Sequence, residues 1–496
     1  MTTMITSRSR LGAVATLISV DRRAAKPIYL QIYEAFRRRI VQRELRPGQV
    51  VPSTRQLARE LRVSRFPVLN AYAQLLAEGY FETRAGAGTF VASSLPEEPA
   101  ARKSRAAAAQ ARGPRSLAAR TSALPRYVSP SWPQGLGPFQ VGHPELESFP
   151  LKIWSKLAAR RARNMRTRDL QYADAFGSEA LRESVATYLR TSRAVLCEAD
   201  QIVIVSGSQQ GLDLTARVLL NQGDAAWVEE PGYWLVHHVL KAAGCRAVPV
   251  PVDPEGLDVS AGVALAAEAR AAFVAPSHQY PLGVTMSAAR RLQLLEWARA
   301  AGAWIVEDDY DSEYRYESAP ISSLQGLDAD SRVIYVGTFS KVLFPSLRLG
   351  YVVVPPDLVD RFAAMRQSMD ICPSPINQAV LTEFIREGHF ARHVRRMRQT
   401  YAERRRVLVR EIERELYPSC KIVGDEAGMH LTILFGGGIE DTEIAAEAAE
   451  KRLWLSPLSL SYVGGSPRRG FVLGFGNTRA SQIPDAVRLL KRLTKA

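Results

Sequence analysis

The chain has 496 residues, more than a single domain usually contains, so we expect at least two folding units. Hydrophobic residues make up 46% of the sequence and charged residues 23%, a composition that excludes a disordered or fibrous chain. The net charge is +15, and residues 1–126 contain 22 Lys and Arg against 8 Asp and Glu, so nearly all of the excess lies in the first quarter. This asymmetry predicts one module that binds a polyanion, with nucleic acid as the first candidate.

The four cysteines show no spacing typical of a zinc site or a disulfide framework, so we expect no metal and a reducing compartment. The longest apolar run near the start, Leu11–Val20, is too short and too rich in Ser and Thr to span a bilayer. We therefore expect a cytoplasmic protein without a membrane partner.

Residues 1–24 are expected to form a tail, and residues 25–95 to form a domain of three helices and a β-hairpin. On the third helix, Val68, Leu69, Tyr72, Leu75 and Leu76 are expected to face the core. The expected elements are a helix that follows Pro27 and ends at Leu45-Arg46-Pro47-Gly48, a helix over Thr54–Leu61 behind the N-cap Ser53, a helix from the N-cap Ser64 to Glu78, and strands over Tyr80–Thr83 and Thr89–Ala92.

This order of elements is typical of a winged helix-turn-helix, in which the third helix enters the major groove and the hairpin contacts the backbone or the minor groove. Hydroxyl and guanidinium groups at two helix N-termini suit phosphates and guanine edges, and small glycines in the hairpin allow close approach to the DNA. The residues expected to contact DNA are Ser53, Arg55, Ser64, Arg65, Thr83, Arg84, Gly86 and Gly88.

The segment contains Pro-Gly, then Pro-Ser-x-Arg-x-Leu-Ala, Val-Ser-Arg, Ala-Glu-Gly-Tyr and Gly-x-Gly-Thr-Phe-Val. In this pattern it resembles the winged helix of GntR-type regulators. It departs from the family at Phe66-Pro67, where relatives commonly have Thr in the first turn of the recognition helix. The DNA target of relatives therefore does not carry over.

Residues 96–136 are expected to be a linker, because Pro96–Pro125 is rich in Pro, Ala, Arg and Ser and contains few large apolar residues. Residues 137–496 alternate apolar strands with amphipathic helices, which predicts an α/β domain with a mainly parallel sheet. The expected strands are Ile202–Val205, Ala225–Val228, Ala247–Val250, Ala272–Val274, Trp304–Glu307, Val333–Val336 and Gly350–Val354, and the expected helices include Leu212–Asn221, Tyr233–Ala243 and Ala288–Ala301.

Several polar segments follow these strands, at the edge of the sheet where ligands bind. They contain a Gly-Ser-Gln turn that can bind a phosphate at a helix N-terminus, an acidic cluster, and a lysine flanked by hydroxyls with Arg348 seven residues later. The acidic cluster alone would equally suit a metal. Together with the lysine and the arginine, it forms the set that pyridoxal phosphate requires.

These residues resemble those of fold-type I aminotransferases, and the combination with a winged helix resembles MocR/GabR-type regulators. The resemblance implies a smaller C-terminal α/β subdomain and a domain-swapped homodimer, in which Tyr172 reaches the partner's cofactor phosphate. It implies Asp308, rather than Asp309, as the partner of the ring nitrogen and Lys341 as the lysine that forms the Schiff base. The cofactor-binding residues that it implies are Ser208, Gln209, Tyr233, His278, Tyr280, Asp308, Tyr310, Thr338, Ser340, Lys341, Arg348 and Tyr172.

We therefore expect a transcriptional regulator that binds operator DNA and senses a small-molecule effector through pyridoxal 5'-phosphate, without net turnover. The alternative is an active aminotransferase with an accessory DNA-binding domain. Ser456–Tyr462 and Phe471–Phe475 contain no arginine for a ligand carboxylate, and Arg468, Arg469 and Arg479 are expected to be exposed. The effector is thus expected to be the cofactor itself or an amine with a less acidic distal group.

Overall fold

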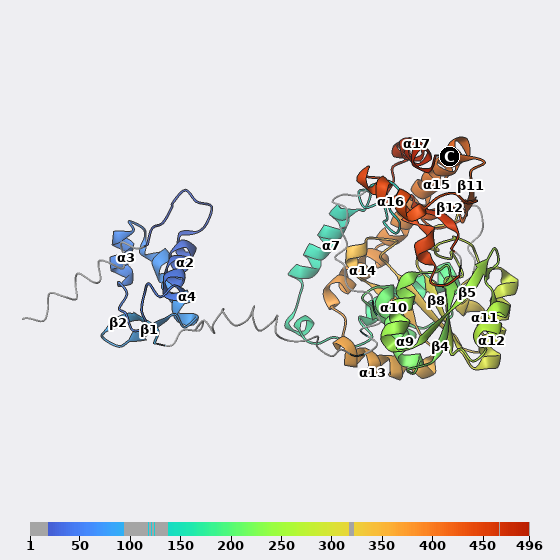
Figure 1. Ribbon diagram of the computed structural model, residues 1–496. Coiled ribbons are helices and arrows are strands. Elements are labelled where there is room, and N and C mark those ends of the chain that lie inside the picture. Colours follow the sequence, from blue (N-terminus) through green and yellow to red (C-terminus); the bar gives the residue numbers. More distant parts are fainter. Residues whose placement is uncertain are drawn as a thin grey trace, which may run out of the picture. The chain divides into compact units, whose positions relative to one another are not determined.

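The structure is a computed structural model that describes residues 18–93, 137–316, 322–465 and 467–495, together with residues 118, 121 and 124. The chain separates into two compact units, Met1–Ser116 and Leu117–Ala496 (Figure 1). Residues 1–17 of the predicted tail and nearly all of the predicted linker lie outside the described residues. Ile18, expected to belong to the tail, is instead buried in the core of the first unit. No helix within the described ranges is both long and apolar enough to cross a membrane.

The first unit contains the predicted winged helix. Antiparallel pairing of its two strands forms the wing, with Phe81 opposite Val91. The rings of Phe36, Tyr72 and Phe81 pack edge to face with centroids 5.1–5.6 Å apart and hold helices and wing together. The elements are α2 (Ile28–Val41), α3 (Thr54–Glu60), α4 (Arg65–Ala77), β1 (Phe81–Arg84) and β2 (Gly88–Val91).

Two local expectations for this unit need correction. Leu69 is 41% exposed rather than part of the core, because it lies about 100° around α4 from the buried Val68. Ser64 does stand at the N-cap of α4, but its side chain makes no capping hydrogen bond. Ser53 caps α3 as expected, because its hydroxyl accepts a hydrogen bond from the backbone N–H of Gln56 at 3.2 Å.

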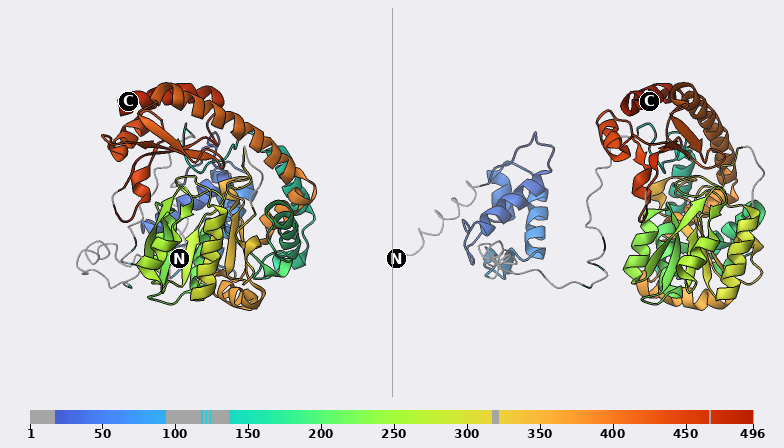
Figure 2. Two further views of the ribbon diagram at one scale, coloured as in Figure 1. Left: turned by 90° about the vertical axis from the view of Figure 1, so that its right-hand side faces the viewer. Right: turned by 45° about the vertical axis from the view of Figure 1, so that its right-hand side comes forward.

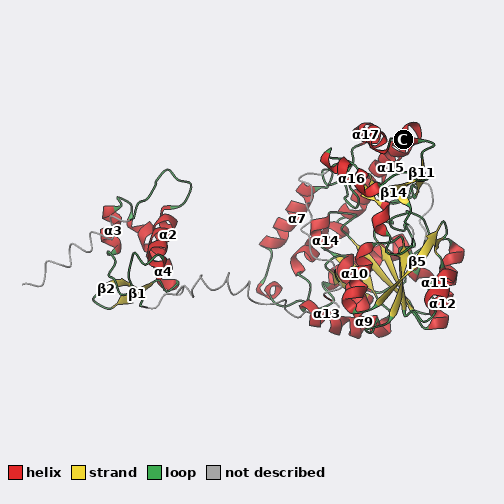
Figure 3. Cartoon of the chain, in the orientation of Figure 1, coloured by secondary structure: helices red, strands yellow, loops and turns green. Residues whose placement is uncertain are grey.

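The second unit is built on an eight-stranded sheet with the order β3-β10-β9-β8-β7-β4-β5-β6. Figure 3 draws the strands in yellow, with β5 labelled. The five strands from β9 to β5 are parallel, whereas β10 runs antiparallel to both of its neighbours. The strands are β3 (Ile202–Val205), β4 (Ala225–Glu230), β5 (Arg246–Asp253), β6 (Gly256–Leu257), β7 (Ala271–Val274), β8 (Trp304–Asp309), β9 (Val333–Thr338) and β10 (Gly350–Val353).

Helices pack on both faces of this sheet because successive strand residues point to opposite faces. Val228 on β4 belongs to an apolar cluster with residues of α9 (Ser208–Leu219) and α10 (Trp234–Ala243). Its neighbour Trp227 belongs to a cluster with residues of α11 (Val259–Ala266) and α12 (Ala288–Ala301). Ile204 on β3 belongs to a third cluster, with residues of α8 (Glu179–Arg193) and α14 (Pro375–Arg386).

A smaller α/β subdomain completes the second unit, as the sequence predicts. The long helix α15 (His389–Leu416) crosses from the large sheet to this subdomain (Figure 2). The four-stranded antiparallel sheet has the order β11 (Cys420–Val423), β12 (His430–Phe435), β14 (Arg469–Gly474) and β13 (Ser456–Pro457). The helices α16 (Asp441–Glu450) and α17 (Ile483–Thr494) accompany it.

Candidate cofactor site and nucleic-acid interface

A cavity of about 350 Å³ opens at the carboxyl ends of the parallel strands β4, β7 and β8. Most of its wall is apolar, with Val228, Phe273 and Val306 from the strands themselves. Six of the predicted cofactor-binding residues line it: Ser208, Tyr233, Tyr280, Asp308, Tyr310 and Lys341. The fold thus brings together side chains that span more than 130 residues of sequence.

Lys341 follows β9 and points into this cavity. Its Nζ donates a hydrogen bond to the backbone oxygen of Gly142, at 2.9 Å. Burial lowers the pKa of Lys341, while the nearby carboxylates of Asp311 and Asp308 act in the opposite direction. A lysine with a lowered pKa has a larger share of the neutral, nucleophilic amine at neutral pH.

Asp308 and Asp309 at the end of β8 face different surroundings. Asp308 lines the cavity, and burial followed by the charge of Asp309 raises its pKa to about 7. Asp309 instead forms an ion pair with Arg193 at 2.9 Å and accepts a hydrogen bond from the Tyr335 hydroxyl at 2.5 Å. Of the two carboxylates, only Asp308 is therefore placed to meet a ligand in the cavity.

The N-terminus of α9 and Arg348 form the other end of the site. Gly207 has a φ of +91° and precedes the first residue of α9, whose first-turn N–H groups lack helical partners. A Cβ atom at Gly207 would lie 2.8 Å from Nη2 of Arg348, so glycine lets the guanidinium approach this turn. The same Nη2 donates a hydrogen bond to the backbone oxygen of Ser206 at 2.6 Å.

Thr338, Ser340 and Gln209 are the other predicted cofactor residues with hydroxyl or amide side chains. The Thr338 hydroxyl accepts a hydrogen bond from the backbone N–H of Ser340 at 3.2 Å, while Oγ of Ser340 is buried without a partner among the described residues. Gln209 lies in the first turn of α9, and its side-chain N–H donates a long hydrogen bond of 3.4 Å to the backbone oxygen of Leu235.

Tyrosine side chains surround the middle of the cavity. Tyr233 and Tyr280 pack edge to face with ring centroids 6.1 Å apart. The Tyr310 hydroxyl donates a hydrogen bond to the backbone oxygen of His278 at 2.8 Å. Burial raises the pKa of all three tyrosines, so their hydroxyls stay protonated and can act as donors.

Six of the twelve predicted cofactor residues do not line the cavity: Gln209, Thr338, Ser340 and Arg348, described above, and His278 and Tyr172. His278 is buried behind Tyr310, 2% exposed. Tyr172 is 84% exposed and lies away from the cavity lining. Conversely, Asp311 and His430 line the cavity although no prediction assigned them a role there. Asp311 stands three residues after Asp308, a spacing that offered a weak signal, whereas no motif surrounds His430.

The predicted DNA-contacting residues are exposed on the first unit. Ser53 and Arg55 lie at the start of α3, and Ser64 and Arg65 at the start of α4. Nε of Arg65 donates a hydrogen bond to the Thr54 hydroxyl at 3.2 Å, so the two helix starts lie close together.

In the wing, Thr83 and Arg84 are exposed near the turn of the hairpin. The Arg84 guanidinium pairs with Glu82 at 2.7 Å and lies 4.6 Å from the centroid of the Phe90 ring. Gly86 and Gly88 have φ angles of +72° and +110°, and a Cβ at either would meet nothing within 4 Å. The wing therefore presents an open edge.

One exposed residue at the recognition helix was not predicted to contact DNA. Phe66, in the first turn of α4, is 69% exposed. An apolar side chain at this position suits contact with a thymine methyl group in a major groove.

Comparisons with known proteins match each unit to a family. Residues 28–91 match the bacterial regulatory proteins of the gntR family, and residues 139–470 match the aminotransferase class I and II family. The kynurenine aminotransferase of Pyrococcus horikoshii has a similar structure, with a TM-score of 0.67 and 29% identity over 72% of this chain and 90% of that chain. The predicted fold classes of both units are thereby confirmed.

Relatives with both domains cover nearly the whole chain. The probable rhizopine catabolism regulatory protein MocR of Rhizobium meliloti is 40% identical over 96% of this chain and 95% of its own length. The pyridoxine biosynthesis transcriptional regulator PdxR of Corynebacterium glutamicum is 30% identical over 90% of this chain and 91% of its own length. The chain therefore belongs to the MocR-type transcriptional regulators, which join a GntR-type winged helix to an effector domain of the pyridoxal phosphate-dependent aminotransferase family.

Proposed function

We propose that this regulator holds pyridoxal 5'-phosphate at Lys341, binds double-stranded operator DNA through residues 25–92, and responds to an effector that reaches the cofactor. One observation carries the cofactor part of the proposal. Lys341 and Asp308 line one cavity, and Arg348 approaches the turn that leads to Ser208 in the same lining.

Two buried polar atoms without partners support the fit of these residues to the cofactor. Oδ1 of Asp308 and Oγ of Ser340 have no hydrogen-bond partner among the described residues. Buried polar atoms usually have partners, so these two atoms indicate a ligand. A carboxylate suits a protonated ring nitrogen and a hydroxyl suits a phosphate, so the residues fit pyridoxal phosphate.

The phosphate group would bind at the start of α9. There, free backbone N–H groups and the positive end of the helix dipole favour an anion. Arg348 would add a guanidinium that can bind a phosphate through two parallel N–H groups, and Ser208 and Ser340 would add hydroxyl donors.

Bound pyridoxal phosphate supplies an aldehyde that condenses with primary amines and a ring that withdraws electrons. Lys341 offers the amine that holds it, and burial keeps part of that amine neutral. Asp308 would hold the proton on the ring nitrogen, the Tyr310 hydroxyl would donate to the phenolic oxygen, and Tyr233 would cover one face of the ring.

A homodimer would complete the site. Tyr172 and Leu170 are 84% and 73% exposed, unusually high values for such large side chains. We infer that this surface meets a second copy and that Tyr172 reaches the partner's phosphate site, with the winged helices exchanged between subunits. Tyr172→Phe should then weaken cofactor retention without a change in the oligomeric state measured by sedimentation.

The cofactor attachment is tested by reduction with borohydride followed by peptide mapping of full-length protein loaded with pyridoxal phosphate. We expect the mass of the pyridoxyl phosphate group on the peptide that contains Lys341. Lys341→Ala should lose both this label and the visible absorption band, while Lys152→Ala, an exposed control on α7 (Leu151–Arg163), should keep them. Label confined to other lysines would contradict the assignment.

A catalytically active aminotransferase is the second candidate, favoured by the lowered pKa of Lys341 in an aminotransferase fold. Turnover measured across pairs of amino donors and keto acids distinguishes the two. A regulator should show no sustained cycling, whereas steady turnover that is lost in Lys341→Ala would support the enzyme.

A further inference from the structure

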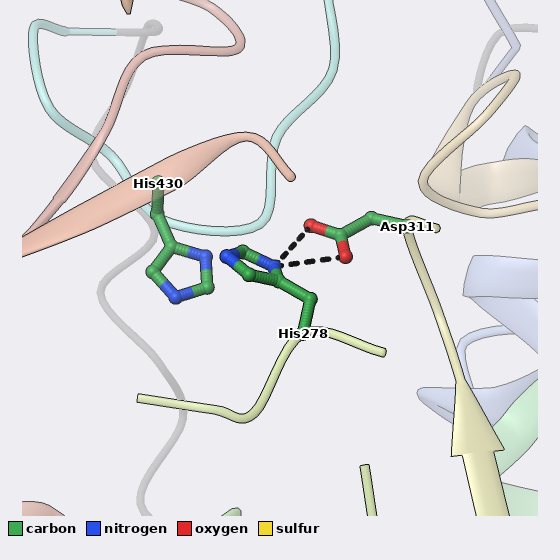
Figure 4. Close-up of side chains that lie close together, drawn as sticks. All are labelled: His278, Asp311 and His430. Carbon is green, nitrogen blue, oxygen red and sulfur yellow. Dashed lines mark hydrogen bonds and ion pairs between the residues drawn. The ribbon is translucent and has the colours of Figure 1, made fainter. Parts of the chain in front are cut away.

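Three polar side chains from distant parts of the sequence form a buried cluster beside Lys341. Figure 4 shows His278 between Asp311 and His430. Nδ1 of His278 lies 3.0 and 3.2 Å from the two carboxylate oxygens of Asp311, and the two imidazole rings have centroids 4.6 Å apart. The three residues are each at most 3% exposed.

The cluster connects the two sheets of the second unit. His278 and Asp311 follow β7 and β8 of the large sheet, whereas His430 begins β12 of the C-terminal subdomain. Asp311 also accepts a hydrogen bond from the backbone N–H of Met429 at 3.2 Å. A Cβ at Gly428 would lie about 2 Å from the His278 ring, so the start of β12 packs directly on the cluster. A ligand at the cluster would thus contact both subdomains.

Two ring nitrogens in this cluster lack partners. Nε2 of His278 and Nε2 of His430 are buried and make no hydrogen bond to any described residue. Asp311 and His430 line the same cavity as Lys341. His278 does not line the cavity itself but contacts both residues that do. Because buried polar atoms usually have partners, the unpartnered Nε2 of the cavity-lining His430 indicates a polar ligand group close to the lysine.

The charges that this chain places around the cavity disfavour a carboxylate as the partner of these nitrogens. No arginine lines the cavity in the described part of the chain, and Lys341 is the one basic amine among the lining residues. Burial, followed by the neighbouring His278, lowers the pKa of His430, so its ring is neutral at physiological pH. Asp311 beside it would repel an anion.

The three arginines expected to be exposed near the end of the chain have other partners, and Arg469 is half-buried rather than exposed. Arg469 pairs with Glu440 and Asp441, and Arg479 pairs with Glu147. Nε of Arg468 donates a hydrogen bond to the Tyr462 hydroxyl at 2.8 Å. On β14, Val472 is fully buried and packs in an apolar cluster with Leu282 and Leu458.

A hydroxyl group matches the cluster better than any charged group does. A neutral imidazole donates from one nitrogen and accepts at the other, and a hydroxyl can likewise donate and accept. We propose that the His278–Asp311–His430 cluster binds a hydroxyl group of the effector, which is a primary amine that carries hydroxyl groups and no carboxylate. This inference rests on the proposed function, because the amine of the effector must reach the cofactor at Lys341.

The test uses full-length protein loaded with pyridoxal phosphate and follows the visible absorption of the cofactor. The ligands are matched pairs: 2-aminopropan-1-ol against alanine, which exchanges a hydroxyl for a carboxylate, and 2-aminopropan-1-ol against isopropylamine, which removes the hydroxyl. We expect 2-aminopropan-1-ol to half-saturate the response at a concentration at least about tenfold below both others, since a site built for a hydroxyl rejects analogues without it. Equal or tighter response to alanine would overturn the proposal.

Variants then localise the preference. His430→Leu should remove most of the difference in half-saturating concentration between 2-aminopropan-1-ol and isopropylamine. His237→Leu is the matched control, because His237 is also a buried histidine with an unpartnered Nε2 but does not line the cavity. If His430→Leu does not fold, the two ligand pairs on the wild-type protein still decide the question. An undiminished preference in a folded His430→Leu protein would contradict the proposal.

Two further outcomes separate this proposal from its alternatives. If no visible band forms with pyridoxal phosphate, the proposed function itself fails, whereas a normal band without a preference for the hydroxyl defeats only the present inference. Two histidines and an aspartate also suit a divalent metal. Stoichiometric zinc in the purified protein, or loss of the 2-aminopropan-1-ol response on addition of EDTA, would make the cluster a metal site and overturn the proposal.

Discussion

The Nζ atom of Lys341 donates a hydrogen bond to the backbone oxygen of Gly142, 2.9 Å away, across 199 residues of sequence. The segment around Gly142 is in turn attached to the C-terminal subdomain, because Phe139 pairs with Gly474 on β14 and its N–H donates to the Thr478 hydroxyl at 2.9 Å. A displacement of the C-terminal subdomain would therefore move the carbonyl group that holds the lysine.

Gly142→Ala should impair cofactor attachment at Lys341. Gly142 has a φ of +77°, and an added Cβ would lie 2.7 Å from Nζ, so the substitution strains the backbone and displaces the amine. The measurement is the rate and extent at which the visible band grows after addition of pyridoxal phosphate. Gly223→Ala is the control, because Gly223 has a similar φ of +92° but open space around its Cβ position. Equal band formation in both variants would show that the contact does not position Lys341.

Arg348→Ala should weaken the retention of pyridoxal phosphate by about 1.5–3 kcal/mol, the usual range for a hydrogen bond to a charged group. The guanidinium lies at the Gly207 turn, where we place the phosphate. The dissociation constant can be measured by equilibrium dialysis against the cofactor. Arg348→Lys, which keeps the charge but loses the two parallel N–H groups, should fall between the wild type and Arg348→Ala. Unchanged retention in Arg348→Ala would place the phosphate elsewhere.

Arg55→Ala and Arg65→Ala should each weaken operator binding by roughly 1–3 kcal/mol if they contact guanine edges, and by smaller amounts that do not depend on sequence if they contact only phosphates. Both side chains are exposed at neighbouring helix starts. Fluorescence anisotropy with the upstream DNA and a scrambled duplex, at several salt concentrations, separates the two cases. Arg299→Ala, exposed on α12, should have no effect. Normal binding by both winged-helix variants at moderate salt would refute this docking.

The stability of Glu229→Gln relative to the wild type should increase as the pH rises from about 5 to 8 in cofactor-free protein. Burial raises the pKa of Glu229 to about 8 from the ordinary 4.5. In this range the folded wild type retains a proton that the unfolded chain releases, so rising pH favours unfolding by at most about 1.4 kcal/mol per pH unit. Glutamine does not titrate, so the variant does not lose folding stability in this way as the pH rises. Urea unfolding at several pH values measures the difference in free energy of unfolding between the variant and the wild type. Glu198→Gln is the control, because Glu198 is exposed. A difference that does not change with pH would show that Glu229 titrates normally.

Local sequence patterns predicted most of the fold because they reflect local physics. The 3.6-residue periodicity and Ser53 located α3 and α4 to within one residue, and apolar runs located the buried strands. Strand ends were predicted less well. β4 extends to Glu230 and β8 to Asp309, because these polar residues are paired in the parallel sheet although they do not look like strand residues.

The candidate site was only partly predictable for a different reason. Lys341, Arg348 and Asp308 belong to motifs in which neighbouring residues signal the role. Asp311 and His430 are 119 positions apart in the numbering, and only the packing of β12 against the large sheet brings them to one cavity. Leu69 was placed in the core because it is apolar, but its face of α4 is exposed.

Cofactor binding in the second unit should change the affinity of the protein for DNA. The affinity of the full-length protein for its own upstream DNA is determined at fixed salt in the cofactor-free and the pyridoxal phosphate-loaded forms, for the wild type and for Lys341→Ala/Arg348→Ala. We expect loading to change the affinity of the wild type by about 5-fold to 150-fold, the usual range of allosteric coupling, and to leave that of the double variant unchanged. Identical affinities of the two wild-type forms, or the same change in the double variant, would contradict this expectation.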